Sequence, residues 1–206
     1  MSPRRYVMEG RARTAEETRR RIVEATFALH AERAIGDTTM KDIAERADVG
    51  LGTVYHHFPT YNDAIRACGA HTFAVSAPPD ATIFDGAKSL EDRIARLASE
   101  LFAFYERCPG IGKARADRHK FEALQDHVDL WNAAFAALVN EALRPGSDRA
   151  AFAPVVMALL DFDVHARLIA AGFSTADAAR LIAGMLVDFM KKGQGATRSA
   201  AKTRRT

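Results

Sequence analysis

The sequence predicts an all-α protein with two parts, a small N-terminal helical domain and a larger C-terminal helical bundle. Two observations carry this prediction. Apolar residues recur at spacings of three or four along most of the 206 residues, and no segment shows the alternation typical of a β-strand. The clearest interruption is residues 76–88, which contain Pro78, Pro79 and Gly86 and have no regular period. We therefore expect a linker there.

The composition is that of an ordinary globular chain. Hydrophobic residues make up 48% and charged residues 27%, which is usual for a protein folded in water. The longest apolar run, residues 150–160, is too short to cross a bilayer, and the N-terminus lacks the apolar segment of a secretory signal. Cys68 and Cys108 form no C-x-x-C pair, which favours a reducing compartment. We expect a cytoplasmic protein with no membrane partner.

The charge is unevenly distributed along the chain. Residues 1–21 hold seven arginines and three glutamates, and residues 191–206 hold six Lys/Arg and no acid. The ends carry +4 and +6, so the net charge of +3 leaves −7 on residues 22–190. Basic arms beside a folded domain suit the phosphates of nucleic acid, although solvated tails that aid solubility are an alternative. We predict a flexible basic arm over residues 1–13 and a flexible basic tail over residues 193–206.

The first helix is predicted from a capping signal and an apolar rhythm. Thr14 and Glu17 have the spacing of a capping box, in which a hydroxyl and a carboxylate three residues later cap a helix start. Apolar positions then follow a helical period from Ile22 until Gly36 interrupts it. The N-terminal domain is accordingly expected over residues 14–75, with its last helix over residues 63–75.

Two short helices and a tight turn lie inside this domain. Thr39 and Asp42 repeat the capping-box spacing and open the first short helix. A turn over residues 48–50 leads into the second, which ends before Pro59 because a residue preceding proline is disfavoured in the α conformation. This succession predicts a helix-turn-helix. The residues expected to pin the two helices together are Ile43, Ala44, Val49, Val54 and Phe58.

Beyond the linker, residues 89–192 are expected to form a helical bundle. Pro109-Gly110 and the loop over residues 144–148 divide this part, and Gly172 marks a further break. The expected helices cover residues 90–105, 117–143, 150–171 and 174–192.

No constellation of side chains predicts an enzyme or a metal site. Asp161 and His165 are four residues apart on one expected helix, and His119, Glu122 and Asp126 share a face of another. Neither set is a complete ligand set, so solvated or interface polar groups explain them better. No hydrolase, metalloprotease or dinucleotide signature occurs. We predict no catalytic residue, no metal and no cofactor. An enzyme site inside the bundle and a helix-turn-helix that binds protein remain as alternatives.

The segment TTMKDIAERADVGLGTVYHHFPTYNDAI, residues 38–65, resembles the signature of the TetR family of bacterial one-component transcriptional regulators. The matching features are T-x-x-D-I-A-x-x-A followed by V-x-x-G-T-V-Y-x-H-F-P. The rest of the chain resembles that family only in the number and length of its helices. The resemblance implies a repressor that binds a palindromic DNA operator as a homodimer and is released by a small-molecule effector. An activator of the same fold is the alternative.

The resemblance also assigns residues to the DNA. The groove-facing positions of the second short helix are Leu51, Gly52, Thr53, Tyr55 and His56. Positions that meet the DNA backbone are Thr39, Lys41, His57 and Tyr61. The family often has a cation where this chain has Tyr61, and residues 22–68 hold fewer basic than acidic residues. We therefore expect the arginine-rich arm to supply much of the attraction to phosphates.

Two further sets belong to the C-terminal bundle. The aromatic residues that the resemblance makes candidates for an effector pocket are Phe102, Tyr105, Trp131 and Phe135, and core packing is the alternative. The apolar residues expected at a dimer interface are Leu159, Phe162, Ile169, Leu181, Met185 and Phe189. Burial inside one subunit is the alternative for these.

Overall fold

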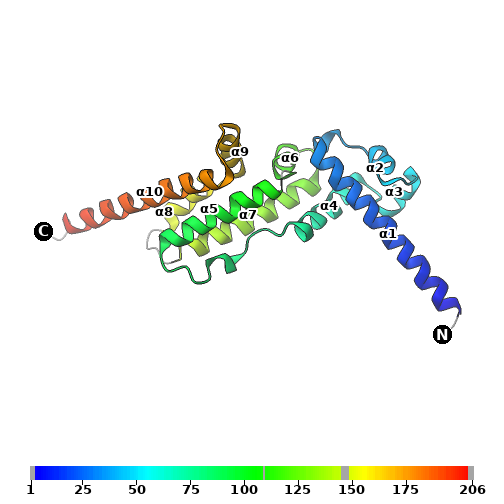
Figure 1. Cartoon of the computed structure of the whole chain (residues 1–206), viewed down its shortest axis with the longest axis horizontal. Helices are drawn as coiled ribbons and strands as arrows, with labels where there is room; N and C mark the ends of the chain where they lie inside the picture. Colours follow the sequence, from blue (N-terminus) through cyan, green and yellow to red (C-terminus); the bar gives the residue numbers. More distant parts are fainter. Residues whose placement is uncertain (1–2, 109, 145–148, 204–206) are drawn as a thin grey trace. The chain divides into compact units, whose positions relative to one another are not determined.

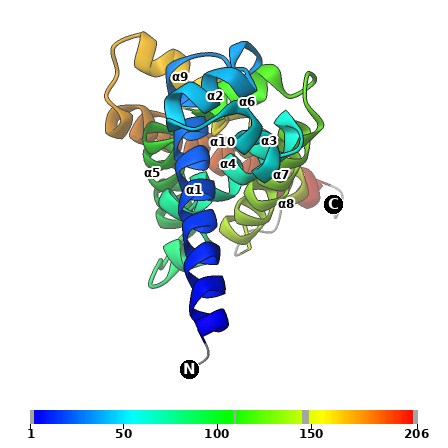
Figure 2. The same ribbon diagram turned by 90° about the vertical axis from the view of Figure 1, so that its right-hand side faces the viewer.

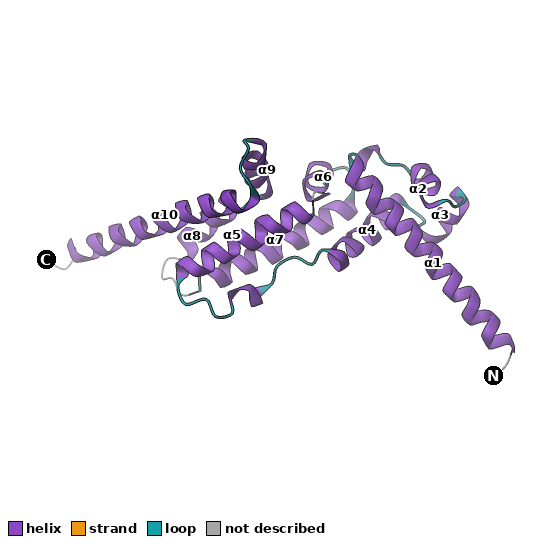
Figure 3. Ribbon diagram, viewed as in Figure 1, coloured by secondary structure: helices purple, strands orange, loops and turns teal. Residues whose placement is uncertain are grey.

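The computed structural model describes residues 3–108, 110–144 and 149–203, and every regular element in these ranges is helical (Figure 3). The all-α prediction is confirmed. The chain divides into two compact units, one of residues 1–77 with 109–129 and the other of residues 78–108 with 130–206. In the part that the structure describes, no helix is long and apolar enough to cross a membrane.

The first unit is built from four helices of the N-terminal segment and a returning segment later in the chain. Its elements are α1 (Pro3–Glu32), the 3-10 turn η1 (Ile35–Asp37), α2 (Met40–Ala47), α3 (Leu51–His57), α4 (Tyr61–Val75), α6 (Gly110–Asp117) and the first turns of α7 (Glu122–Ala142). Figures 1 and 2 show α2 and α3 side by side next to α1.

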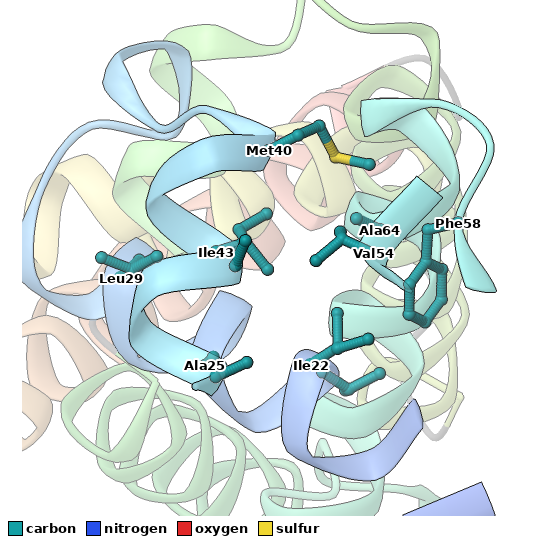
Figure 4. Packing of buried hydrophobic residues seen from close by; sticks show 11 residues of the cluster. Ile22, Ala25, Leu29, Met40, Ile43, Val54, Phe58 and Ala64 are labelled. Carbon is teal, nitrogen blue, oxygen red and sulfur yellow. The ribbon is translucent and has the colours of Figure 1, made fainter. Parts of the chain in front are cut away.

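The core of this unit joins α1 to the helix-turn-helix. Figure 4 shows Ile22 and Leu29 of α1, Ile43 of α2, and Val54 and Phe58 of the α3 segment gathered around one apolar centre. All five side chains are at most 2% exposed. The predicted buried set is confirmed for Ile43, Ala44, Val54 and Phe58, and Val49 is half-buried against the same cluster.

Helix α1 begins earlier than the sequence predicted. Thr14 does not cap a helix start: its hydroxyl donates to the carbonyl of Gly10 at 3.0 Å, four residues back inside the helix. Arginine, methionine and alanine are strong helix formers and continue α1 to Pro3. The basic segment expected as a flexible arm over residues 1–13 is thus helical from Pro3. Residues 1–2 lie outside the described part.

Helix α6 and the start of α7 join the first unit through specific polar contacts. Asp117, buried within α6, accepts a hydrogen bond from the backbone N–H of Gly36 at 2.8 Å and pairs with Lys120. Asn62 of α4 accepts from the backbone N–H of Ala123 at 3.1 Å. These contacts explain why residues 109–129 cluster with the N-terminal helices, whereas the sequence led us to assign them to a domain of residues 89–192.

A glycine lets α4 and α7 approach closely. A Cβ atom on Gly69 would lie 1.9 Å from Nε2 of His127. The His127 ring is held in place because its Nδ1–H donates to the carbonyl of Ala123 at 2.7 Å and its face stacks on Phe73.

We expect Gly69→Ala to lower the free energy of unfolding by about 1–3 kcal/mol, the usual cost of overpacking. Urea denaturation would measure this loss. The double variant Gly69→Ala, His127→Ala should recover part of it, because the clashing ring is gone. A Gly69→Ala protein as stable as the unchanged chain would contradict the close approach.

The second unit is a helical bundle. Its elements are the 3-10 turn η2 (Ala81–Phe84), α5 (Leu90–Arg107), the remainder of α7, α8 (Arg149–Leu159), α9 (Phe162–Ala170) and α10 (Thr175–Thr203). The prediction of a single helix over residues 150–171 is wrong, because this segment forms two helices, α8 and α9. It is broken because Asp161 accepts a hydrogen bond from the backbone N–H of Asp163 and caps a new helix, α9.

The segments predicted as a linker, residues 76–88, and as a flexible tail, residues 193–206, both contain helical structure. The expected linker, residues 76–88, contains η2, and its Phe84 is buried under the guanidinium of Arg93 at 4.4 Å. Arg93 also donates to the carbonyls of Glu141 and Ala142, so it satisfies the last carbonyls of α7. Helix α10 runs through the predicted tail as far as Thr203, and residues 204–206 lie outside the described part.

Candidate nucleic-acid interface

Local signals in the sequence fix the geometry of α2, the turn and α3. The Thr39 hydroxyl accepts from the backbone N–H of Asp42 at 3.1 Å, and the Asp42 carboxylate accepts from the N–H of Thr39 at 2.8 Å. This capping box confirms the predicted start of α2. The helix ends at Asp48, whose φ of 52° lies in the left-handed region that Asp tolerates better than most residues. Gly50 then begins α3 without a side-chain cap.

Helix α3 is divided into a buried side and an open side. Val54 is fully buried and Phe58, directly after the helix, is 2% exposed. On the other side Leu51 is 41% and Tyr55 48% exposed. Gly52 and His56 are also exposed, as is Thr39 before α2, whereas His57 is half-buried. Thr53, also predicted to face the groove, is half-buried. Leu51, Gly52, Tyr55 and His56 therefore lie on the accessible side of α3, which offers the Tyr55 hydroxyl, the His56 imidazole and little bulk at Gly52, and Thr53 is less accessible.

The four basic residues between Ile22 and Cys68 are all engaged by acids. The pairs are Arg33 with Asp42, Lys41 with Glu45, Arg46 with Glu32, and Arg66 with Asp63, Glu122 and Asp126. Lys41 is the most open of the four, with 77% of its side chain exposed and a loose ion pair of 3.7 Å. Surface pairs of this kind contribute about 0–1 kcal/mol, so they can exchange partners. Thr39, the other residue predicted to contact the DNA backbone at the start of α2, uses its hydroxyl to donate to the Asp42 carboxylate in the capping box.

Arg19 is a candidate that sequence reasoning missed. It lies on α1, thirty-nine positions before Phe58, yet its guanidinium sits 5.0 Å from the centre of the Phe58 ring. Burial, His56 and Arg19 lower the pKa of His57. A proton on His57 is thus disfavoured, and the positive charge beside the end of α3 is that of Arg19. Only the packing of α1 against α3 reveals this, because the spacing in sequence carries no signal.

The assignment of Tyr61 to the DNA backbone needs correction. Its hydroxyl donates to the carbonyl of Ile35 at 2.7 Å and accepts from Nε2 of His30 at 2.9 Å. Burial raises the pKa of the Tyr61 hydroxyl and lowers the pKa of His30 to about 4, so both groups are neutral at pH 7. The thiol of Cys68 lies 3.5 Å from Nδ1 of His30. Tyr61 therefore closes an internal chain of hydrogen bonds, with its ring against Phe121.

The aromatic residues predicted to line a pocket come together in the second unit. Phe102, Tyr105, Trp131 and Phe135 are at most 6% exposed. Trp131 makes stacked ring contacts with Phe104 and with Phe135, whose ring centres are 4.9 and 6.3 Å away. Sequence reasoning missed Phe104 and also His165, which lies 5.0 Å from the centre of Phe102. These rings form one buried aromatic cluster.

The residues predicted for a dimer interface divide into an open and a half-buried group. On α10, Leu181, Met185 and Phe189 are 40%, 50% and 45% exposed and recur every four residues along one face. Ile169 of α9 is 39% exposed. Leu159 and Phe162 are half-buried. Within the described residues, no group of three or more His, Cys, Asp or Glu side chains is arranged to hold a metal ion.

Comparison with known proteins relates this geometry to a family. Residues 22–63, which hold the end of α1 and the whole helix-turn-helix, match the model of the bacterial regulatory proteins of the tetR family. The transcriptional repressor KstR of Mycolicibacterium smegmatis is 27% identical over 68% of this chain and 71% of its own length. KstR of Mycobacterium tuberculosis is 28% identical over 51% of this chain, and the match spans about half, 48%, of that relative.

Solved structures share the fold across both units. The transcriptional regulator FadR from Bacillus subtilis, solved in complex with stearoyl-CoA, has a TM-score of 0.61 at 14% identity. The match covers 81% of this chain and 96% of that one. Residues 22–63 therefore carry a helix-turn-helix of the tetR family of bacterial regulatory proteins, and the chain shares the helical fold of the solved regulators.

Proposed function

We propose that the protein is a repressor that binds a palindromic DNA operator as a homodimer in the bacterial cytoplasm and is released by a small-molecule effector. The observation that carries the proposal is the accessible face of α3, held rigidly by the buried Val54 and Phe58. A short helix presented in this way fits the major groove, where small residues allow close approach and polar side chains contact base edges.

The proposed DNA contacts are the positions that the resemblance assigns, without Tyr61 and with Arg19 added. Leu51, Gly52, Thr53, Tyr55 and His56 face the groove, and Thr39, Lys41, His57 and Arg19 contact the backbone. Tyr61 is left out because its hydroxyl is used inside the unit. Phosphate contacts position a protein on DNA, and base contacts give the sequence preference.

The open stripe of Leu181, Met185 and Phe189 supports a homodimer. Contiguous exposed apolar surface of this kind usually marks an interaction site. The same stripe on a second copy would complete an isologous four-helix contact between two α9–α10 pairs. A dimer carries two helix-turn-helix domains and binds an operator with two half-sites far more tightly than one domain does, because the second binding step is intramolecular.

The buried aromatic cluster of the second unit supports effector binding. Two structures of similar fold were solved in complex with small molecules, FadR of Bacillus subtilis with stearoyl-CoA and a protein of Saccharomonospora viridis with choline. For this chain the effector would act by favouring a conformation in which the two α3 helices no longer fit successive grooves. Such a ligand shifts the equilibrium only by its difference in affinity for the two states.

Deleting residues 1–13 is expected to weaken DNA binding and flatten its dependence on salt. The reason is that the four basic residues between Ile22 and Cys68 are paired with acids, whereas this segment brings four arginines. The slope of log K against log salt becomes shallower by about 0.9 for each phosphate that the protein no longer neutralises. Fluorescence anisotropy over a salt series would measure it. An unchanged slope would show that the segment does not bind DNA.

Gel-shift competition with the protein's own promoter fragment at moderate salt tests the proposal as a whole. We expect a complex that survives an excess of unrelated DNA. A complex that dissociates equally with both competitors would leave only nonspecific binding and would contradict an operator-binding repressor.

A further inference from the structure

Two ring nitrogens in the second unit are buried without hydrogen-bond partners. Among the described residues, neither Nε1 of Trp131 nor Nε2 of His165 meets a donor or acceptor. Both side chains are only 6% exposed. Buried polar atoms are nearly always paired, and an unpaired one destabilises the folded state, so each exception needs an explanation.

The two nitrogens border the same aromatic cluster. The ring of Tyr105 lies 6.2 Å from the ring of Trp131 and 5.8 Å from that of His165. Its hydroxyl donates elsewhere, to the carbonyl of Leu160 at 3.1 Å. The surrounding rings are Phe102 and Phe104 of α5, Phe135 of α7 and Phe162 of α9. The cluster thus combines an apolar wall with two unused polar groups.

Helix α9 is attached to the unit in an unusual way. Its one buried residue is His165, and its other residues are half-buried or exposed. The loop that follows contains Gly172, whose φ of 93° favours glycine. For packing alone, a leucine at position 165 would serve better than His165, because it would bury apolar surface and leave no buried nitrogen without a hydrogen bond. Phe162 of the same helix is half-buried, with its ring 5.5 Å from that of Tyr105. Short helices with one buried residue are among the segments that open locally more easily than the core.

The chemistry of the two groups narrows the compound. Burial lowers the pKa of His165, with the charge of Glu106 acting in the opposite direction. His165 is therefore neutral at pH 7, with one N–H and one bare nitrogen. Trp131 can only donate, so it needs an acceptor oxygen. The charge that acts on His165 is the acid Glu106, which disfavours a carboxylate ligand.

We propose that Trp131 and His165 are the polar contacts of an effector site for a neutral, ring-containing apolar compound that carries a carbonyl or hydroxyl oxygen. The rings of the aromatic cluster bury its body, and the two nitrogens bind its oxygen atoms. This assignment rests on the ligand-responsive part of the proposed function and adds the ligand class and the residues that recognise it.

Three probes with a common two-ring skeleton test the assignment on the full chain. Benzophenone carries a carbonyl, diphenylmethane has a methylene in its place, and 4-benzoylbenzoate adds a charge. We expect calorimetry to give benzophenone about two- to tenfold higher affinity than diphenylmethane, the effect of one hydrogen bond, and weaker binding of the benzoate. Trp131 is the one tryptophan of the chain, so its fluorescence should change on titration. Equal affinity for the ketone and the hydrocarbon, tighter binding of the benzoate, or no binding of benzophenone would overturn the proposal.

Variants separate recognition from a structural role. Trp131→Phe should abolish the preference for benzophenone over diphenylmethane. His165→Leu should raise the melting temperature of the unliganded protein by about 2–4 °C, because an unpaired nitrogen is removed. The control Phe102→Leu, which removes apolar surface in the same cluster, should lower it. If His165→Leu lowers the melting temperature as Phe102→Leu does and Trp131→Phe keeps the ketone preference, the nitrogens are structural and the proposal is wrong.

Measuring operator binding with the same protein samples distinguishes failure of the effector site from failure of the proposed function. Specific DNA binding without a ketone preference overturns the effector site alone. A ketone preference without specific DNA binding overturns the repressor and leaves the site standing.

Discussion

Replacing Tyr55 by alanine is expected to lower operator affinity by at least about 30-fold, because an interaction worth about 1 kcal/mol or more is removed at each of two half-sites. Tyr55 is 48% exposed on the open face of α3, and Val54 beside it is fully buried. The substitution therefore removes a side chain from the proposed groove face and leaves the core of the unit intact. Anisotropy titration of a labelled operator would measure the affinity.

Two controls make this result interpretable. The melting temperature and the oligomeric state of Tyr55→Ala should match those of the unchanged chain, since exposed substitutions usually change stability by less than about 0.5 kcal/mol. Tyr55→Phe separates the ring from the hydroxyl and should lose affinity only if the hydroxyl bonds to DNA. Full operator affinity in a folded Tyr55→Ala protein would refute the role assigned to α3.

Replacing Met185 by glutamate is expected to convert the proposed homodimer into a monomer. Met185 is the centre of the open stripe on α10 and is 50% exposed. In a closed dimer its charge would lie among Leu181 and Phe189 of both copies without a partner, and a buried unpaired charge is strongly destabilising. Light scattering on a size-exclusion column would give the mass. Operator affinity should fall by about 100-fold or more, because a monomer lacks the second DNA-binding domain of the dimer.

The effect of position can be separated from the effect of charge. Ala176→Glu adds the same charge to the exposed first turn of α10, off the stripe, and should leave the dimer intact. Met185→Leu keeps the stripe apolar and should also remain dimeric. A dimeric Met185→Glu protein, or one that dissociates no more than Ala176→Glu does, would place the interface elsewhere.

The parts of the fold that were predictable from sequence are those fixed by local signals. The Thr39–Asp42 capping box, the stop at Pro59 and the apolar period of α2 and α3 each act within a few residues, and together they located the helix-turn-helix. A local signal also misled at Thr14, because a threonine inside a strongly helical segment can bond back to a carbonyl four residues earlier.

Features that depend on contacts between distant residues were not predictable. Tyr61 turns inward because Ile35 and His30 supply its hydrogen-bond partners, and Arg19 reaches Phe58 only through the packing of α1. The assignment of residues 109–129 to the first unit depends on Asp117 meeting Gly36, eighty-one positions away. Contacts between residues so far apart in the sequence leave no pattern of spacing from which they could be predicted.

Selection of bound duplexes from a random pool tests the central claim most directly. The full chain is incubated with the pool at moderate salt, and the retained sequences are determined. A dimer that presents two α3 helices should enrich an inverted repeat whose half-sites are about one helical turn, roughly 10 base pairs, apart. Enrichment of a single half-site without symmetry, or of no sequence, would contradict a dimeric operator-binding repressor.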